Sequence, residues 1–232
     1  MFNYILCIRW FCYIYNDSEV RHLISLNLYK LIYDLNQDNR GIKMKSINNR
    51  NPWHTIKPGT DLLNTVNAVI EIPMGSKAKY ELDKESGLLK LDRVLFSSVH
   101  YPANYGFIPR TIADDGDPLD ILVISSLEVE PMCILTAKII GVMHMVDDDE
   151  NDEKIIAVAD KDMAVNYINS LAGLPPHTMV ELKRFFEDYK KLEHKHVEVN
   201  EFLESEFAYK IIETSMERYN NEFGLKGSIN QN

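Results

Sequence analysis

Three aspartates lie within six residues of one another, directly before an apolar run. Residues 115–120 read Asp-Gly-Asp-Pro-Leu-Asp, and Ile-Leu-Val-Ile follows at 121–124. Crowded carboxylates repel one another unless protons or cations neutralise them. Their hard oxygen atoms suit Mg²⁺, Mn²⁺ or Ca²⁺ better than Zn²⁺. Asp115, Asp117 and Asp120 therefore indicate a divalent-cation site at the mouth of a strand.

A calcium-binding EF-hand loop is the first alternative for these acidic residues, and the spacing excludes it. Such a loop requires Gly at its sixth position and Glu at its twelfth. Counted from Asp115, these positions hold Asp120 and Ser126. Counted from Asp147, they hold Asp152 and Val158. A solvated acidic turn remains open for either run taken alone.

A second acidic run covers residues 147–153 and also follows an expected strand. It reads Asp-Asp-Asp-Glu-Asn-Asp-Glu and ends at Lys154. If the two strand-end clusters converge, they form one site for several metal ions. Such a site clamps both the attacking and the leaving oxygen of a phosphoryl transfer.

Metal ions alone would bind phosphate without orienting it, so cationic and aromatic residues are the next candidates. Lys79 and Glu81 share one face of a strand because side chains alternate along it. Taken singly, each cation is more readily interpreted as a surface charge and each tyrosine as a core or rim ring. The candidates are Lys79, Arg93, Tyr101, Tyr105, Tyr189 and Lys190.

Hydrophobic periodicity predicts a strand-rich body followed by helices. Short apolar or alternating runs predict strands at 66–72, 78–82, 88–94, 119–125, 134–145 and 154–158. Helical spacing follows at 160–171, 177–194 and 203–223. This order predicts an α+β fold dominated by a small β-barrel or sandwich. The stretch 101–106, which contains a proline and a glycine, is predicted to be a loop.

The composition is that of a folded protein, with 45% hydrophobic and 26% charged residues in 232. A net charge of −10 argues against nucleic-acid binding, which normally requires a basic face. Three cysteines without zinc or disulfide-scaffold spacing favour a reduced, cytoplasmic protein. No run approaches the roughly 20 apolar residues that span a bilayer, so no membrane association is expected.

Residues 1–50 differ from the remainder, with no proline and a single glycine, Gly41. Residues 18–35 have the spacing of a helix, but no obvious partner element follows. Three interpretations remain open: a docking helix, a disordered targeting extension, and translated upstream sequence with the true start at Met44. We favour the last two. We therefore expect an extension over 1–50 and one catalytic domain over 51–232.

Taken together, the candidate residues resemble the family I soluble inorganic pyrophosphatases in their compact, bacterial-type form. The similarity runs from about residue 66 to about residue 193, and residues 115–121 fit the family signature at every position. The supporting blocks lie at 69–73, 79–84, 92–93, 101–106, 147–154 and 185–190. The first 50 residues have no counterpart in the compact members.

The resemblance implies a five-stranded OB-like barrel with helices packed outside it and an active site at the barrel mouth. It also implies inorganic pyrophosphate as the substrate and several Mg²⁺ ions per site, with Mn²⁺ as a substitute. Compact members commonly assemble as hexamers, so the resemblance favours a homo-oligomer of that size.

The resemblance also assigns roles to individual residues of this sequence. Asp117 contacts the nucleophilic water. The metal ligands are Asp115, Asp120, Asp147 and Asp152, with Glu81 acting partly through metal-bound water. The residues that hold phosphate oxygens are Lys79, Arg93, Tyr105, Lys154, Tyr189 and Lys190. Supporting positions behind them are Glu71, Tyr101 and Asp148.

The expected reaction is the in-line attack of a metal-activated water on pyrophosphate, which yields two phosphates. Two alternatives stay open: a metal-dependent hydrolase of another phosphate ester or nucleotide, and a non-catalytic module that binds divalent cations or phosphate. Phosphate release from pyrophosphate, compared with ATP and p-nitrophenyl phosphate, separates the three.

Overall fold

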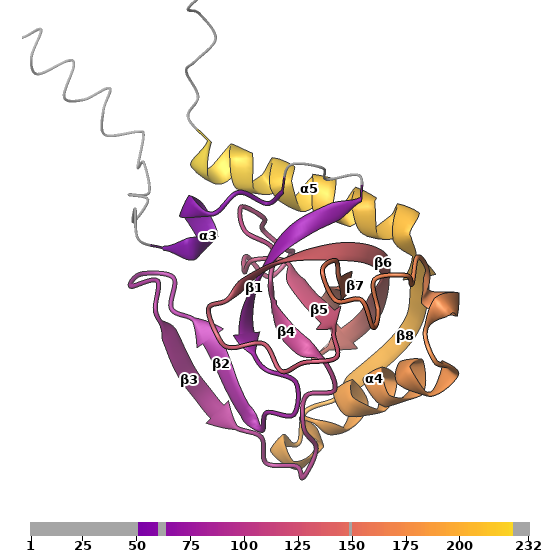
Figure 1. Cartoon of the computed structure of the whole chain (residues 1–232). Coiled ribbons are helices and arrows are strands. Elements are labelled where there is room, and N and C mark those ends of the chain that lie inside the picture. The colour runs from indigo at the N-terminus through magenta and orange to yellow at the C-terminus, as the bar shows by residue number, and fades with distance from the viewer. Residues whose placement is uncertain (1–50, 60–63, 149, 225–232) are drawn as a thin grey trace, which may run out of the picture. The chain divides into compact units, whose positions relative to one another are not determined.

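Five strands form a closed, hydrogen-bonded ring in the computed structural model, which describes residues 51–59, 64–148 and 150–224. Helices pack outside this ring (Figure 1). In chain order the elements are α3 (Pro52–Thr55), β1 (Thr65–Ile72), β2 (Ala78–Leu82), β3 (Leu89–Val94), β4 (Asn104–Phe107), β5 (Asp120–Ile124), β6 (Ile134–Asp147), β7 (Glu150–Ala159), the 3₁₀ helix η1 (Leu171–Gly173), α4 (Pro176–Asp188), the 3₁₀ helix η2 (Lys191–Glu193), β8 (Val197–Glu204) and α5 (Ser205–Phe223).

The ring runs in the order β1, β4, β5, β7, β6 and closes because β6 also pairs with β1. The 14-residue length of β6 makes this closure possible. Residues 134–138 of this strand pair with β1, and residues 137–147 pair with β7. β8 adds a sixth strand along the second half of β6, and β2 with β3 forms a separate hairpin. This arrangement confirms the predicted α+β fold with a five-stranded barrel.

Residues 121–123 of β5 and 155–158 of β7 are buried, which explains why these runs are continuously apolar. Ile121 and Ile155 belong to the core that Ile212 of α5 completes. Leu122 and Ile156 belong to the core that α4 completes. Because successive side chains of a strand point to opposite faces, each of these strands contributes to both cores. The two strands that carry Asp120, Asp152 and Lys154 are therefore held from both sides.

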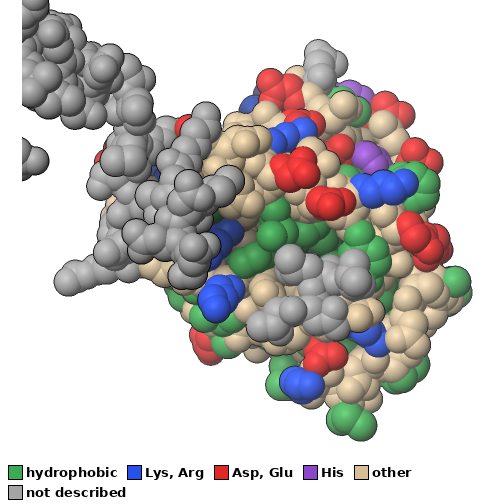
Figure 2. Space-filling view, turned by 90° about the horizontal axis from the view of Figure 1, so that it is seen from above, with side chains coloured by type: hydrophobic (Ala, Val, Ile, Leu, Met, Phe, Trp, Pro, Cys, Tyr) green, Lys and Arg blue, Asp and Glu red, His purple; other side chains and the backbone are tan. Residues whose placement is uncertain are grey.

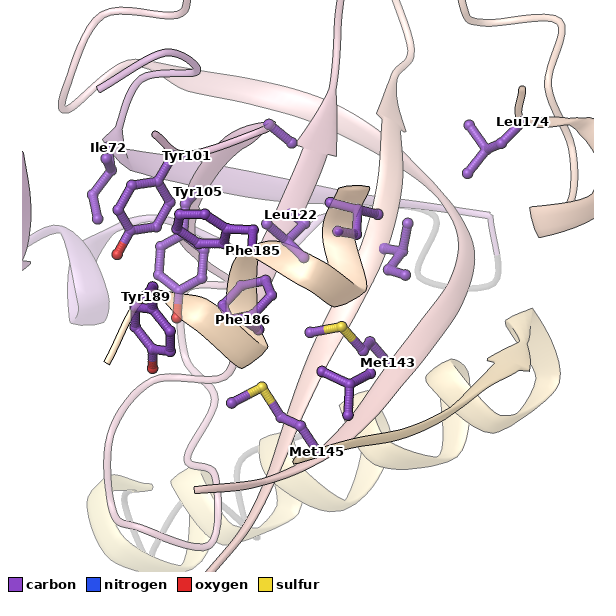
Figure 3. Packing of buried hydrophobic residues seen from close by; sticks show 14 of the residues in the cluster. Ile72, Tyr101, Tyr105, Leu122, Met143, Met145, Leu174, Phe185, Phe186 and Tyr189 are labelled. Carbon is purple, nitrogen blue, oxygen red and sulfur yellow. The ribbon is translucent and has the colours of Figure 1, made fainter. Parts of the chain in front are cut away.

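Helix α4 contributes an aromatic cluster to its core, shown in Figure 3. Phe185 and Phe186 are almost completely buried. The ring of Tyr101 lies 4.8 Å from that of Phe185, and the ring of Tyr189 lies 5.5 Å from that of Phe186. The Tyr105 ring packs beside Tyr101 at 5.5 Å. This packing orients three tyrosines that the sequence predicts to be part of the site or to support it.

The helix predicted over residues 160–171 is wrong; turns occupy most of this stretch. The Asp162 carboxylate accepts hydrogen bonds from the Ser126 and Ala164 N–H groups at 2.6 and 2.9 Å and from the Ser125 hydroxyl. Asn166 donates to the Asp160 carbonyl at 3.2 Å. Short polar side chains of this kind offer the backbone an alternative to helical hydrogen bonding.

Two strands were absent from the sequence prediction. The stretch 101–106, predicted as a loop, includes the start of β4, which pairs with β1 on one side and β5 on the other. Gly106 permits this close packing, because a Cβ atom there would lie 1.9 Å from the Val69 carbonyl oxygen. β8 precedes a helix that begins at Ser205 rather than at residue 203. The alternation Val-Glu-Val at 197–199 was the available signal for this strand.

The second predicted helix, 177–194, is shorter than expected. α4 ends at Asp188, and Tyr189 and Lys190 lie at the turn that follows. His194 then adopts a left-handed conformation with φ of 59°. Helical spacing continued past Asp188 in the sequence, but the change of direction at this turn points Tyr189 and Lys190 at the β-barrel.

All described residues belong to one compact unit. The helix predicted at 18–35 and the extension 1–50 lie outside the described residues, so the domain boundary stays a prediction. No helix within the described ranges is long and apolar enough to cross a membrane. On the face shown in Figure 2, acidic side chains are interspersed with lysine and arginine.

Candidate active site

One cavity of about 340 Å³ collects the predicted site residues, except for Arg93, Tyr101 and Asp148. Seven carboxyl groups and four lysine ammonium groups line it. The two acidic clusters, separated in the sequence, meet here because β5 and β7 are neighbours in the ring. The predicted convergence of the clusters is confirmed.

A tight turn presents Asp115 and Asp117 to the cavity. The Asp117 N–H donates to Asp115 Oδ1 at 2.8 Å, and the Ala113 N–H donates to the Asp117 carbonyl at 2.8 Å. Gly116 has a φ of +82°, which glycine adopts without strain. Burial, together with the charges of Asp117 and Asp120, raises the pKa of Asp115. A carboxylate disfavoured in this way gains from a neighbouring cation.

Lys154 joins the two acidic clusters. The parallel register sets Ile121 opposite Ile155, so the residues just before them, Asp120 and Lys154, lie side by side. Lys154 Nζ donates to Asp120 Oδ2 at 2.6 Å and to Asp152 Oδ1 at 2.8 Å. Burial by itself lowers the pKa of Lys154, but the two carboxylates outweigh burial and raise it well above the usual value. The buried ammonium group therefore stays charged.

Two buried tyrosines supply neutral donors. The Tyr105 hydroxyl donates to Asp120 Oδ2. The Tyr189 hydroxyl donates to Asp147 Oδ2 at 3.3 Å. Burial, reinforced by the nearby carboxylates, raises the pKa of both phenols well above 10, although Lys154 opposes the shift at Tyr189. Both hydroxyls therefore keep their protons at neutral pH.

Asp147 lies at the end of β6 and meets the turn after α4. Its Oδ2 pairs with the Lys190 ammonium group. Its Oδ1 is buried and has no hydrogen-bond partner among the described residues. A buried carboxylate oxygen without a partner is costly unless a cation or a water meets it. This oxygen is the clearest sign in the described chain of an additional ligand at the site.

The β2–β3 hairpin contributes Lys79 and Glu81, which share one strand face as predicted. The Lys79 ammonium group pairs with Glu81 and donates to Asp92 Oδ2 at 3.2 Å. Lys79 is directly opposite Arg93 in the hairpin register. The bulge between Lys79 and Tyr80 breaks the regular pairing at this point.

Glu71 and Tyr101 are both buried, and Glu71 also lines the cavity; their supporting role stays a prediction. Glu71 is 7% exposed, and its Oε1 accepts a hydrogen bond from the Leu82 N–H at 2.7 Å. Burial, and then the charge of Asp120, raises the pKa of Glu71 from its usual 4.5 to about 8. Tyr101 is 2% exposed and packs against Tyr105.

Arg93 and Asp148 lie outside the cavity lining and have other partners. Arg93 Nε donates to Glu193 Oε1 at 2.8 Å, and its Nη1 donates to Asp92 at 2.5 Å. Asp148 pairs with Lys195 at 2.9 Å and is half-exposed. Their predicted contacts, with phosphate and within the supporting layer, stay predictions.

Sequence reasoning assigned no role to Lys84, which lines the cavity and pairs with Asp117. It also overlooked Glu193, the partner of Arg93. Lys84 is the last residue of the block 79–84, so its place in that block and in a hairpin next to the site was the available signal. The partner of each lysine depends on contacts between distant segments, which local patterns do not contain.

The donor set suits a hard divalent cation. Within residues 51–59, 64–148 and 150–224, no three acidic, histidine or cysteine side chains converge as ready-made metal ligands. In the cavity, lysine ammonium groups contact the carboxylates instead. Mg²⁺ is usually bound through one or two carboxylates together with water and substrate phosphates, rather than by an all-protein cage. The carboxylates and the unpartnered oxygen of Asp147 fit this mode of binding.

Comparisons with known sequences point to one family. Residues 68–220 match the family model described as inorganic pyrophosphatase. Soluble inorganic pyrophosphatase 2 of Chlamydomonas reinhardtii is 54% identical over 172 residues, which are 74% of this chain and 90% of that protein. Soluble inorganic pyrophosphatase of Oryza sativa subsp. japonica is 53% identical over 168 residues, which are 72% of this chain and 78% of that protein.

Solved structures agree with the sequence matches. The inorganic pyrophosphatase of Helicobacter pylori is 42% identical with a TM-score of 0.69, covering 72% of this chain and 99% of that one. The enzyme of Thermus thermophilus is 36% identical with a TM-score of 0.70, covering 72% of this chain and 98% of that one. With the fold, the acidic cavity and these matches in agreement, the chain belongs to the family I soluble inorganic pyrophosphatases.

Proposed function

We infer that this chain hydrolyses inorganic pyrophosphate to two phosphates. One observation carries the inference: a single cavity joins the two acidic clusters to the lysines and tyrosines that a polyanionic substrate requires. Family membership supplies the substrate, because the family model and the relatives carry that activity in their names.

We propose Mg²⁺ as the cofactor, with Mn²⁺ as a substitute. Seven carboxyl groups against four ammonium groups leave the cavity with an excess of negative charge, which would repel pyrophosphate. Bound cations reverse that field. The residues that would hold them are Asp115, Asp120, Asp147 and Asp152, with Glu81 contributing through water. When bound, these ions lower the pKa of water and neutralise phosphate charge.

The protein's own residues would orient the reactants. Asp117, on its tight turn, accepts the proton of the attacking water. The ammonium groups of Lys79, Lys154 and Lys190 exchange carboxylate oxygens for phosphate oxygens. The hydroxyls of Tyr105 and Tyr189 keep their protons and donate hydrogen bonds. Catalysis then rests on positioning and charge neutralisation, and no covalent bond to the protein is needed.

The Arg93 guanidinium would join phosphate binding by leaving Glu193 or Asp92. Its planar fork suits the bidentate recognition of phosphate oxygens. Asp148 would support Asp147 from the adjacent position.

We also propose that the chain forms a homo-oligomer, preferably a hexamer, and that it is located in the cytoplasm. The nearly complete coverage of the compact Helicobacter and Thermus chains supports the oligomer proposal.

A phosphate-release assay tests the function directly. The full chain is incubated with Mg²⁺ and either pyrophosphate, ATP or p-nitrophenyl phosphate, and activity is lost when a chelator replaces Mg²⁺. Turnover confined to pyrophosphate supports the proposal. Preferential turnover of ATP or the phenyl ester would indicate a different phosphohydrolase, and no turnover of any of them would indicate a binding module.

Lys190→Ala is expected to raise KM for pyrophosphate about 3- to 10-fold and to leave kcat within roughly threefold. The reason is that Lys190 contacts Asp147 at the edge of the cavity, where it binds substrate and transition state alike. Lys191→Ala is the matched control, because Lys191 is 67% exposed and pairs with Asp188 outside the cavity. Steady-state kinetics of both variants check this. Complete loss of activity in Lys190→Ala would show that the residue acts in the chemical step.

Glu71→Gln is expected to stabilise the metal-free protein at alkaline pH. The pKa of Glu71 is about 8 in the fold against 4.5 for the usual group, so the folded protein binds more protons between these values. The unfolding free energy of the wild type therefore falls as pH rises through this window. The amide keeps an acceptor for the Leu82 N–H and removes the charge.

Denaturant unfolding in chelator, from pH 5 to 9, measures this effect. Between pH 5 and pH 9, the unfolding free energy of Glu71→Gln should rise relative to that of the wild type by about 3–5 kcal/mol. Glu85→Gln, at an exposed position in the turn of the β2–β3 hairpin, serves as the control. Parallel pH profiles for the wild type and Glu71→Gln would contradict the expectation.

A further inference from the structure

The chain enters the catalytic barrel through a short segment, Asn51–Thr55, that is tied to the β2–β3 hairpin. Asn51 is completely buried. Its side-chain Oδ1 accepts from the Trp53 N–H at 2.9 Å and caps α3, while its Nδ2 donates to the Lys84 carbonyl at 2.8 Å. One buried side chain therefore links the start of this segment to Lys84.

Trp53 fixes the same segment to the loop before the Asp115 turn. Its ring is 4% exposed, and its Nε1 donates to the Thr111 carbonyl at 2.8 Å. The Thr111 hydroxyl accepts in turn from the Leu119 N–H at 2.9 Å. The Arg110 N–H donates back to the Trp53 carbonyl at 2.9 Å. These bonds hold both ends of the turn that carries Asp115 and Asp117 relative to the segment.

Lys84 lies between this segment and the turn. Its ammonium group is 6.0 Å from the centre of the Trp53 ring, a distance at which a cation is attracted to an indole face. The same group donates to the Gly116 carbonyl at 3.3 Å and pairs with Asp117 Oδ1. Among the lysines described in the cavity lining, Lys84 is thus the one that pairs with Asp117.

The ion pair itself contributes little to stability. The Lys84 and Asp117 side chains are 47% and 55% exposed. Exposed pairs of this kind contribute roughly 0–1 kcal/mol. The backbone of Lys84 is nevertheless anchored by a buried side chain, and its ammonium group is directed by Trp53 and Gly116. The position of the Lys84 ammonium group is therefore better explained by the geometry of these contacts than by a gain in folding stability.

We propose that Lys84 is a positioning residue for Asp117, and that the segment Asn51–Thr55 holds Lys84 in place. This inference rests on the proposed function, in which Asp117 accepts a proton from the attacking water. An ammonium group against one carboxylate oxygen restricts the rotation of that carboxylate. The second oxygen then meets the water in one orientation, and small errors of placement at such a step reduce turnover strongly.

Kinetics of three variants test the role of Lys84. We expect Lys84→Ala to lower kcat roughly 5- to 20-fold and to change KM less than about twofold. Lys84→Arg, which keeps the charge, should recover most of kcat. Lys90→Ala, on the exposed hairpin face outside the cavity, should behave as the wild type. An unchanged kcat in Lys84→Ala, or an effect confined to KM, would overturn the proposal.

The segment is tested by a double mutant. Trp53→Phe retains an aromatic ring and loses the hydrogen bond to Thr111. It should lower kcat in the same direction as Lys84→Ala, and the double variant should be no slower than Lys84→Ala alone. Independent, multiplicative effects would overturn the role of the segment. Asn51→Ser, which keeps a capping oxygen and loses the Nδ2 donor, replaces Trp53→Phe if that variant does not fold.

Trp53 fluorescence provides a readout that does not depend on activity. The chain contains only two tryptophans, Trp10 and Trp53, so a Trp10→Phe background isolates the second. In that background, Lys84→Ala should shift the emission maximum because it removes a charge beside the ring. Asp117→Asn should shift it as well, by releasing the ammonium group, and Lys90→Ala should not. Unchanged emission in both Lys84→Ala and Asp117→Asn would contradict the geometry.

Failure of this inference is distinguishable from failure of the proposed function. Wild-type protein that releases no phosphate from pyrophosphate would remove the proposed function. Wild-type protein that turns over normally, with an equally active Lys84→Ala, would remove only the role of Lys84.

Discussion

Asp117→Asn is expected to lower kcat for pyrophosphate roughly 10²-fold or more, the usual scale for loss of a general base. The amide has the size of the carboxylate but cannot accept a proton from water. Folding should be unaffected, because the side chain is 55% exposed and surface substitutions usually change stability by less than about 0.5 kcal/mol. The turn itself depends on backbone groups of residues 113–117 and on the Asp115 carboxylate, all of which the substitution leaves in place.

Asp114→Asn is the matched control for this experiment. Asp114 lies three residues away on the same loop, is 52% exposed and pairs with Arg218 at 2.5 Å outside the cavity. Its kcat should stay within about twofold of the wild type. Steady-state phosphate release, together with thermal unfolding of each variant, makes the comparison. Near wild-type kcat in Asp117→Asn would remove the proton-accepting role from this residue.

Lys154→Met is expected to cost about 3–5 kcal/mol of unfolding free energy in chelator, the usual result of breaking a buried ion pair from one side. Lys154 is 3% exposed and lies within hydrogen-bond distance of Asp120 and Asp152. Methionine fills similar volume without charge, so the two carboxylates face each other uncompensated. Denaturant unfolding at pH 7 measures the loss.

The pH dependence of this loss has a definite sign. Burial already raises the pKa of Asp152, and the charge of Lys154 opposes that shift. Without Lys154 the folded-state pKa rises further above the unfolded value, so protonation at low pH restores stability. The deficit of Lys154→Met should therefore shrink as pH falls from 7 towards 5. Added Mg²⁺ should reduce it at constant pH, because a bound cation replaces the missing charge.

Lys161→Met isolates the effect of burial. Lys161 pairs with Asp160 at 2.8 Å, as close as Lys154 to Asp152, but its side chain is 90% exposed. The Lys161→Met variant should unfold at nearly the same denaturant concentration as the wild type, because exposed ion pairs contribute little to stability. Equal losses in the two variants would show that burial of the Lys154 pair is not what makes it important.

Local sequence determined the chemistry of the site. The acidic segment 115–120 leads directly into an apolar run, and this order alone predicts carboxylates at a strand end. The strand follows as β5, beginning at Asp120. The same reasoning placed the second acidic run beside β6 and β7. Residue type and two-residue periodicity are local properties, so a single sequence is enough to reveal them.

Local patterns misassigned elements whose structure depends on distant partners. Proline and glycine in the stretch 101–106 indicate a loop by their local preferences. Pairing with β1 and β5 overrides those preferences at Asn104–Phe107, and Gly106 allows the close approach. At 160–171 the opposite occurs: helical spacing is present, but Asp162 bonds to a loop 36 residues earlier. Neither outcome follows from the residues of the segment itself.

The sequence by itself determined which residue types do the chemistry and where along the chain they occur. Only the tertiary structure decided which charges meet. Barrel closure buries Lys154 between Asp120 and Asp152, and the turn after α4 brings Lys190 to Asp147. The contact of Trp53 with Lys84 joins residues 31 positions apart. Ion pairing and burial depend on distances in space, and these are set by long-range packing rather than by neighbouring residues.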